Sequence, residues 1–319
     1  MGVRRNILSS TQARDQFLDG VLALDQTMTG LMASDVYGFL RGIIPNIRMA
    51  GTDQELSYYD LLVVWHAAAM RLSIPPGNAA HGAPIFLPWH RMYLILLERW
   101  IQQALGNPEF GLPYWDWAED GELPASSQWR IRLWDSDYLG EARNDVVGGR
   151  VGQMRVRLWS DRSETIWSIP PRRLTRDAGT DPAFRSLPSR ADVSAALQET
   201  DYDRSPWSGS ALGGGHRNHV EGWLSGPRLH NLVHVWIGGD MGPATSPNDP
   251  AFFLNHCNVD RIWEAWMAQH GRTYQPVGNE GPEGHRLNDT MFAILGETLT
   301  PAQVLDVAAR YTYDSLTVD

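Results

Sequence analysis

Six of the ten histidines of the chain fall into two groups of three, and each group lies in strongly apolar sequence. The first group is His66, His81 and His90, and the second is His230, His234 and His256. A neutral imidazole buried in such surroundings needs a partner for both ring nitrogens, because an unpaired buried polar group is costly. Two metal ions, each bound by three imidazoles, satisfy all six side chains at once. The sequence therefore predicts a pair of histidine-bound metal sites.

The spacing of these histidines places most of them on helices that face a core. His230 and His234 are four residues apart and so share one face of a helix. His66, His90 and His256 each lie on an apolar stripe with the spacing i, i+3, i+4, i+7. The segment 77–89 is expected to be a loop that carries the remaining histidine. We expect a mainly α fold in which a four-helix bundle houses the metal centre and long loops wrap it.

The ligand type narrows the choice of metal. A di-iron bundle needs inward Glu-x-x-His pairs, and none lies beside these histidines. Zinc accepts three imidazoles, but the His230–His234 pair lacks the glutamate of a metalloprotease motif. The single cysteine, Cys257, excludes a thiolate cluster. Imidazole sites suit copper well, so copper is favoured and a structural zinc bundle is the alternative.

These stretches resemble the CuA and CuB regions of the tyrosinase family of type 3 copper proteins. Two further blocks carry the resemblance, PYWDW at 113–117 and SPNDPAFF at 246–253. The resemblance implies that the first histidine group binds CuA and the second binds CuB. It also implies two copper ions, O2 as co-substrate, and oxidation of o-diphenols to o-quinones, with hydroxylation of monophenols in true tyrosinases.

Four more residues are candidates for the chemistry around the copper ions. By resemblance, Glu221 matches a glutamate that holds a water near the site and Asn231 matches its partner, so together they would take the proton from a phenol. Asp260 lies one helical turn after His256 and is the candidate to hold the second nitrogen of a ligand histidine, with an arginine salt bridge as the alternative. Asn255 replaces a histidine that usually precedes the last CuB ligand. Its amide is expected to hydrogen-bond an ortho substituent, which favours o-diphenols and o-aminophenols over monophenols.

Composition excludes several kinds of partner. The chain has 319 residues, 43% of them hydrophobic, and a net charge of −10. This charge argues against nucleic acid and anionic membranes, and no run of about 18 apolar residues is present to cross a membrane. No apolar stretch follows residues 1–6, so no signal peptide is expected. We expect a cytoplasmic protein, or one exported only with a partner that carries the signal.

The resemblance covers nearly the whole chain and ends at Tyr311-Thr312-Tyr313, which resembles the signature that closes the catalytic core of this family. We expect residues 1–319 to form one catalytic domain without a C-terminal shielding domain. A hemocyanin-like O2 carrier is a distant alternative, because a carrier must exclude phenols and a shield serves that purpose. An o-aminophenol oxidase with little monophenolase activity is the closer alternative. Besides a small phenolic substrate, a small copper-delivery helper protein is an expected partner, since bacterial relatives often need one.

Capping residues and prolines predict where several helices begin. Ser10 or Thr11 is expected to cap a first helix and Ser189 a later one, and Pro227 and Pro250 are expected to open the third and fourth ligand helices. The segment 119–225 is expected to consist mainly of ordered loops around the bundle.

Overall fold

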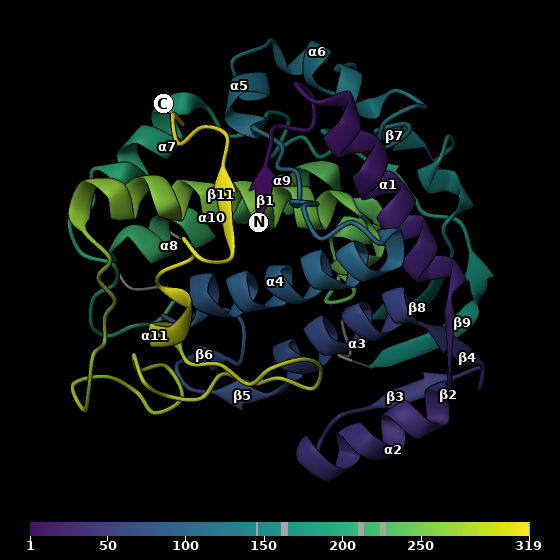
Figure 1. The fold of residues 1–319 in the computed structure, drawn as a ribbon, viewed down its shortest axis with the longest axis horizontal. Coiled ribbons are helices and arrows are strands. Elements are labelled where there is room, and N and C mark those ends of the chain that lie inside the picture. Colours follow the sequence, from purple (N-terminus) through teal and green to yellow (C-terminus); the bar gives the residue numbers. More distant parts are fainter. Residues whose placement is uncertain (145, 161–164, 210–213, 224–227, 319) are drawn as a thin grey trace.

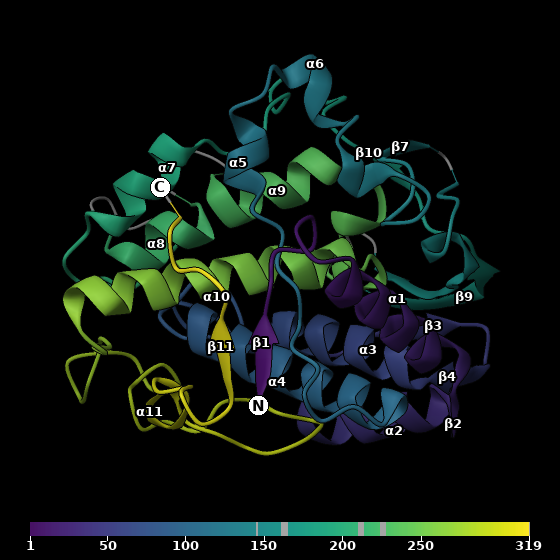
Figure 2. The ribbon, with the colours of Figure 1, turned by 45° about the horizontal axis from the view of Figure 1, so that its top comes forward.

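The computed structural model describes residues 1–144, 146–160, 165–209, 214–223 and 228–318. Its centre is a bundle of four helices, α3 (Tyr58–Arg71), α4 (Phe86–Leu105), α9 (Leu229–Ile237) and α10 (Ala251–His270). Figure 1 shows α4 and α10 side by side in the middle of the molecule, with α3 next to α4, where Tyr93 of α4 donates to the carbonyl of Leu62 on α3. In Figure 2, α9 lies on the other side of α10. The fold is mainly α with a helical core, as the sequence predicts.

Local sequence explains the ends of α3 and α4. Ser57 and Asp60 form a capping box at the start of α3, in which each side chain accepts the backbone N–H of the other residue. α4 begins at Phe86, earlier than the predicted start at His90. Pro88 fits there because the first turn of a helix has backbone N–H groups without helical partners. The helix ends at Gly106, whose φ of 60° is left-handed.

The other two bundle helices carry the second histidine group. The described part of α9 begins at Leu229, and the start predicted at Pro227 lies outside the described residues. α10 follows Pro250, as predicted, and ends at Gly271.

Further helices surround the bundle, and one large hydrophobic core joins residues from Ile7 to Val318, beside a small second cluster of Ile95, Val307 and Tyr311. α1 (Thr11–Gln26) is capped by Ser10, one of the two predicted candidates, and not by Thr11, and α7 (Arg190–Leu197) is capped by Ser189 as predicted. The other helices are α2 (Ala33–Ile43), α5 (Trp117–Gly121), α6 (Ala125–Gln128), α8 (His216–Glu221) and α11 (Pro301–Val304). Within the described ranges, no helix has the length and apolar character needed to span a membrane.

Short strands lie at the margins of the bundle. β8 (Val156–Ser160) pairs with β9 (Ile166–Arg172) in antiparallel, and β3 (Met49–Gly51) adds to β9 in parallel. The expectation of loops over 119–225 is therefore wrong at this place, where side chains of β8 alternate between buried and half-buried. The remaining strand pairs are β1 (Gly2–Arg4) with β11 (Tyr311–Tyr313), β2 (Met28–Met32) with β4 (Glu55–Ser57), β5 (Ser73–Ile74) with β6 (Gly77–Asn78), and β7 (Arg143–Asn144) with β10 (Arg176–Asp177).

Candidate metal centre

The structure gathers the six histidines into the two predicted groups. Within each group one ring nitrogen from every histidine lies within 4.8 Å of the others. The first group takes one residue each from α3, the loop before α4, and α4. The second takes two from α9 and one from α10. Each group therefore has the three convergent nitrogens that one metal ion requires.

The two groups lie against each other. The rings of His90 on α4 and His256 on α10 stack with their centroids 4.1 Å apart. Across the same boundary, the rings of His81 and His230 are 6.1 Å apart. Packing of α4 against α10 thus joins two three-histidine sites into one dinuclear centre.

Main-chain carbonyls orient the rings. Nδ1 of His66 donates to the carbonyl of Ala244 at 2.7 Å, Nδ1 of His90 to that of Phe86 at 2.8 Å, and Nδ1 of His234 to that of Met241 at 2.8 Å. A proton on Nδ1 leaves the lone pair on Nε2, and Nε2 of these three residues is buried without a hydrogen-bond partner among the described residues. Buried nitrogen lone pairs that lack a proton donor fit a metal ion as their partner.

Burial also sets the protonation state of the ligands. It lowers the pKa of His66 to about 3 and that of His234 to about 4. The other four imidazoles have pKa values well below their usual range for the same reason. All six are therefore neutral near pH 7, and the neutral imidazole is the form that binds metal.

A cavity of about 390 Å³ opens onto the histidines. This volume lies in the range of small-molecule sites, about 300–1,000 Å³. Trp223, which is 48% exposed, forms part of its wall. The site residues that line it are His66, His81, His230, His234 and Asn231.

Glu221 lies behind this cavity rather than on its surface. Its Oε1 accepts the N–H of Gly82 at 2.7 Å and its Oε2 accepts from Arg217 at 2.9 Å. Burial raises the pKa of Glu221, and the positive charge of Arg217 opposes that rise. The main-chain carbonyl of Glu221 lies 3.4 Å from Nδ1 of His230, so the residue is one hydrogen bond away from the histidine cluster.

Arg217 is a site residue that sequence reasoning missed. It precedes Glu221 by four residues on α8, and an arginine and a glutamate at that spacing share one helix face. The pair could therefore have been predicted from the sequence if a helix had been expected there. A helix of six residues carries too few apolar positions for its period to be recognised.

Asn255 does not reach the cavity. It is fully buried, and neither Nδ2 nor Oδ1 has a hydrogen-bond partner among the described residues. It precedes His256 by one position, and one residue turns the side chain by about 100° around a helix. Its side chain therefore leaves the histidine face of α10, and the predicted contact with an ortho substituent finds no support in this arrangement.

The prediction that Asp260 holds a ligand histidine is wrong. Its Oδ1 accepts from Arg91 at 2.5 Å, and its Oδ2 accepts from Arg4 at 3.1 Å and from the hydroxyls of Tyr311 and Tyr313 at 2.6 Å each. Two buried guanidinium groups attract the carboxylate more strongly than a neutral imidazole does. The arginine salt bridge that was the alternative is the role the structure shows.

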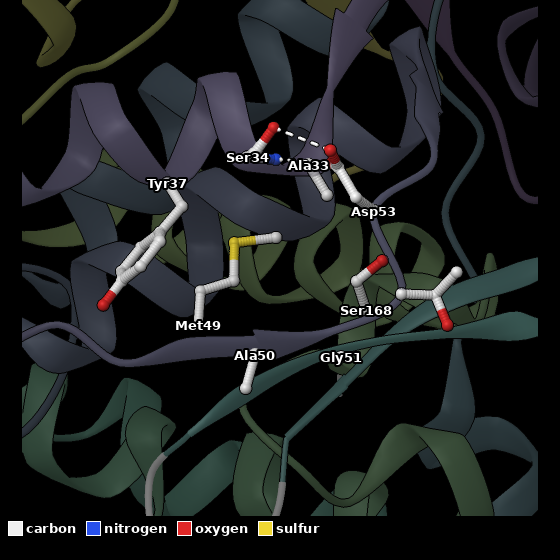
Figure 3. Close-up of a pocket in the computed structure, with 9 residues that line it drawn as sticks. Ala33, Ser34, Tyr37, Met49, Ala50, Gly51, Asp53 and Ser168 are labelled. Carbon is white, nitrogen blue, oxygen red and sulfur yellow. Dashed lines mark hydrogen bonds between the residues drawn. The ribbon is translucent and has the colours of Figure 1, made fainter.

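Figure 3 shows a second cavity, of about 130 Å³, between α2 and the strands β3 and β9. Its one acidic side chain, Asp53, already accepts from the backbone and hydroxyl of Ser34. None of the histidines lines it, so this cavity is separate from the metal centre.

Comparison with known proteins agrees with this site. The tyrosinase family profile, which describes the common central domain of tyrosinase, matches residues 56–269. The chain is 39% identical over 264 residues to the tyrosinase of Streptomyces glaucescens, covering 81% of this chain and 89% of that protein. It is 35% identical over 270 residues to the grixazone synthase of Streptomyces griseus, covering 73% and 81%. A polyphenol oxidase mutant of Thermothelomyces thermophila shares the fold, with a TM-score of 0.70, 22% identity and coverage of 98% and 88%.

Together with the match to the tyrosinase family, the paired three-histidine sites define a type 3 copper protein. The chain belongs to the tyrosinase family. It is a copper-dependent phenol oxidase of the tyrosinase type, and its cofactor is a pair of copper ions that the two histidine groups can hold. The oxygen-carrier alternative is not favoured, because the curated relatives are enzymes.

Proposed function

We propose that this enzyme converts both monophenols and o-diphenols to o-quinones, with the six histidines as the copper ligands. When bound, the copper pair exchanges two electrons with O2. The observation that carries the proposal is the position of Asn231, which lines the cavity directly beside His230, with Glu221 buried behind it. A monophenol differs from an o-diphenol in needing hydroxylation first, and a base near the entering phenol favours that step.

Asn231 and Glu221 act together in removing the proton of the phenol. The Asn231 amide donates to the carbonyl of Gly222 at 3.4 Å, its side chain also hydrogen-bonds to His230, and an amide oxygen has two lone pairs with which to accept. The Glu221 carboxylate accepts from Gly82, Arg217 and the Trp223 side chain, and one of its four lone pairs stays open to a water. A water held between Glu221 and Asn231 can therefore take the proton from the phenol hydroxyl and pass it to the carboxylate, which leaves a phenolate in the cavity.

The substitutions Glu221→Gln and Asn231→Ala should lower monophenol hydroxylation far more than o-diphenol oxidation. Loss of a general base typically lowers the reaction rate by about 100-fold or more. We expect the rate of monophenol hydroxylation to fall by that order and the rate of catechol oxidation to fall by less than about tenfold. Initial rates on a monophenol and its matching catechol, both divided by copper content, measure the ratio.

Met70→Leu is the matched control, because Met70 lines the same cavity and the exchange conserves volume without adding or removing a proton acceptor. Its monophenol-to-catechol ratio should stay at the wild-type value. If both Glu221→Gln and Asn231→Ala keep the wild-type ratio at full copper content, these residues do not take the phenol proton.

The narrower alternative, an o-aminophenol oxidase with little monophenolase activity, depended on Asn255 beside the substrate. The burial of Asn255 away from the cavity removes that argument. We retain as proposals that the chain forms one catalytic domain, that it is cytoplasmic or exported with a partner, and that a small helper protein delivers its copper.

A further inference from the structure

His81 is the one histidine of the metal centre that no helix carries. It lies in the loop between β6 and α4. Its Nδ1 has no hydrogen-bond partner among the described residues, whereas Nδ1 of His66, His90 and His234 each donates to a main-chain carbonyl. The position of the His81 ring therefore depends on how firmly the backbone of its loop is held.

Two side chains from distant parts of the sequence bond to this backbone just after His81. Glu221 accepts the N–H of Gly82 at 2.7 Å. The hydroxyl of Tyr202 donates to the carbonyl of Pro84 at 2.6 Å. The side chains of Tyr202 and Glu221 are fully buried, and Gly82 is half-buried at the cavity wall, so the Tyr202 bond in particular is shielded from water.

Both contacts depend on Arg217. Its Nη1 donates to Glu221 at 2.9 Å and its Nε donates to Asp203 at 2.7 Å, and these three side chains have no exposed surface. The backbone N–H of Arg217 also donates to the carbonyl of Tyr202 at 2.8 Å, and Asp203 is the next residue along the chain. The Arg217 guanidinium thus links Glu221, whose carboxylate accepts the Gly82 N–H, to the segment that carries the Tyr202 hydroxyl.

We propose that Arg217 is a positioning residue for the copper centre, which holds the His81 loop in place through Glu221 and Tyr202. The inference rests on the proposed function in that His81 is taken as a copper ligand. Groups that orient a ligand from outside typically change metal affinity by about 10–100-fold when they are removed. Loss of Arg217 should therefore weaken the first copper site and spare the second, which has no ligand in this loop and whose His230 meets the main-chain carbonyl of Glu221 and not the carboxylate that Arg217 holds.

The test is a titration of the metal-free full chain with copper(I) in competition with a coloured copper(I) chelator. Wild-type protein should bind two ions tightly. Arg217→Met should retain one tight site and bind the other ion about 10–100-fold more weakly. Arg217→Lys keeps a positive charge between the two carboxylates and should recover part of that loss. After exposure to air, a chain that holds a single copper(II) should give the paramagnetic resonance signal of an isolated ion.

Two backgrounds show which site is affected. In His256→Ala, where the first group alone is complete, Arg217→Met should weaken the remaining copper site. In His66→Ala, where the second group alone is complete, the same change should leave the remaining affinity within about twofold. Arg157→Met is the matched control, because Arg157 also bridges two buried carboxylates, those of Asp25 and Asp60, and contacts no part of the His81 loop.

Tyr202→Phe removes one hydroxyl and no charge, so it keeps the test decisive if Arg217→Met does not fold. It should weaken the first site in the same direction by a smaller factor. Unchanged affinity of the first site in Arg217→Met, or in Tyr202→Phe where the arginine variant does not fold, overturns the proposal. Equal weakening of both sites also overturns it. A wild-type chain that fails to bind two copper ions instead contradicts the proposed function itself.

Discussion

Replacing His90 or His256 by alanine should remove one copper ion from the loaded protein and reduce oxygen uptake with catechol by about 1,000-fold or more, which is about 4 kcal/mol of activation free energy. These residues come from the two helices that meet at the centre, and their rings stack 4.1 Å apart. Each is one of only three nitrogens in its group. Alanine leaves two ligands for that ion and disturbs the ring of the opposite group.

The matched control is His219→Ala. His219 is a half-buried histidine on α8 that pairs with Glu199 at 3.2 Å and belongs to neither group. It should keep both copper ions and at least about half of the oxygen uptake. Copper content by atomic absorption and oxygen consumption by electrode give the two readouts. A His90→Ala or His256→Ala protein that kept two copper ions and full uptake would show that the residue is not a ligand.

Asp260→Ala should destabilise the fold by about 3–5 kcal/mol, the usual cost of removing one partner from a buried charge network. The carboxylate accepts four hydrogen bonds and sits between the guanidinium groups of Arg4 and Arg91, which are fully buried. In the variant, Arg4 still pairs with Glu98 and Arg91 with Glu264. The positive charges of the two arginines therefore remain partly compensated. The network also ties the β1–β11 pair to α10, because the hydroxyls of both β11 tyrosines donate to Asp260.

Urea unfolding of the copper-free protein measures this loss, with Arg99→Ala as the comparison. Arg99 pairs with Glu297 at 3.2 Å, and the side chains are 44% and 58% exposed. Such a surface pair contributes less than about 1 kcal/mol. If Asp260→Ala instead loosened copper binding without changing the unfolding midpoint, Asp260 would act on the copper centre and not on the fold.

Periodicity made the bundle and the two histidine groups predictable from the sequence. Histidines at helical spacing on apolar stripes must face the core, and six imidazoles in one core need metal partners. His81 was placed in a loop by its neighbouring glycines and prolines, and the structure puts it there. The same reasoning applied to Asp260 gave the wrong partner. A spacing of one turn from His256 fixes the face of the helix, but Arg4 and Arg91 arrive from other elements that the spacing does not reveal.

Asn255 and Arg217 show two further limits of sequence reasoning. The residue next to a ligand on a helix points about 100° away from it; for Asn231 that direction is still the cavity wall, whereas for Asn255 it is the buried interior. Arg217, in contrast, acts through contacts with Asp203 and Glu221 that join α8 to a loop. Long-range contacts of this kind leave no periodic pattern in a sequence, and they become visible only in the fold.

Oxygen uptake by the copper-loaded wild-type chain with a monophenol, the matching catechol and o-aminophenol tests the central claim most directly. We expect uptake that depends on copper, with two catechol molecules oxidised and two water molecules formed for each O2, and hydroxylation of the monophenol at a measurable rate. Uptake that stops after about one O2 per chain with every substrate, and is reversed by removing O2, would contradict the account, because it describes a carrier and not an oxidase.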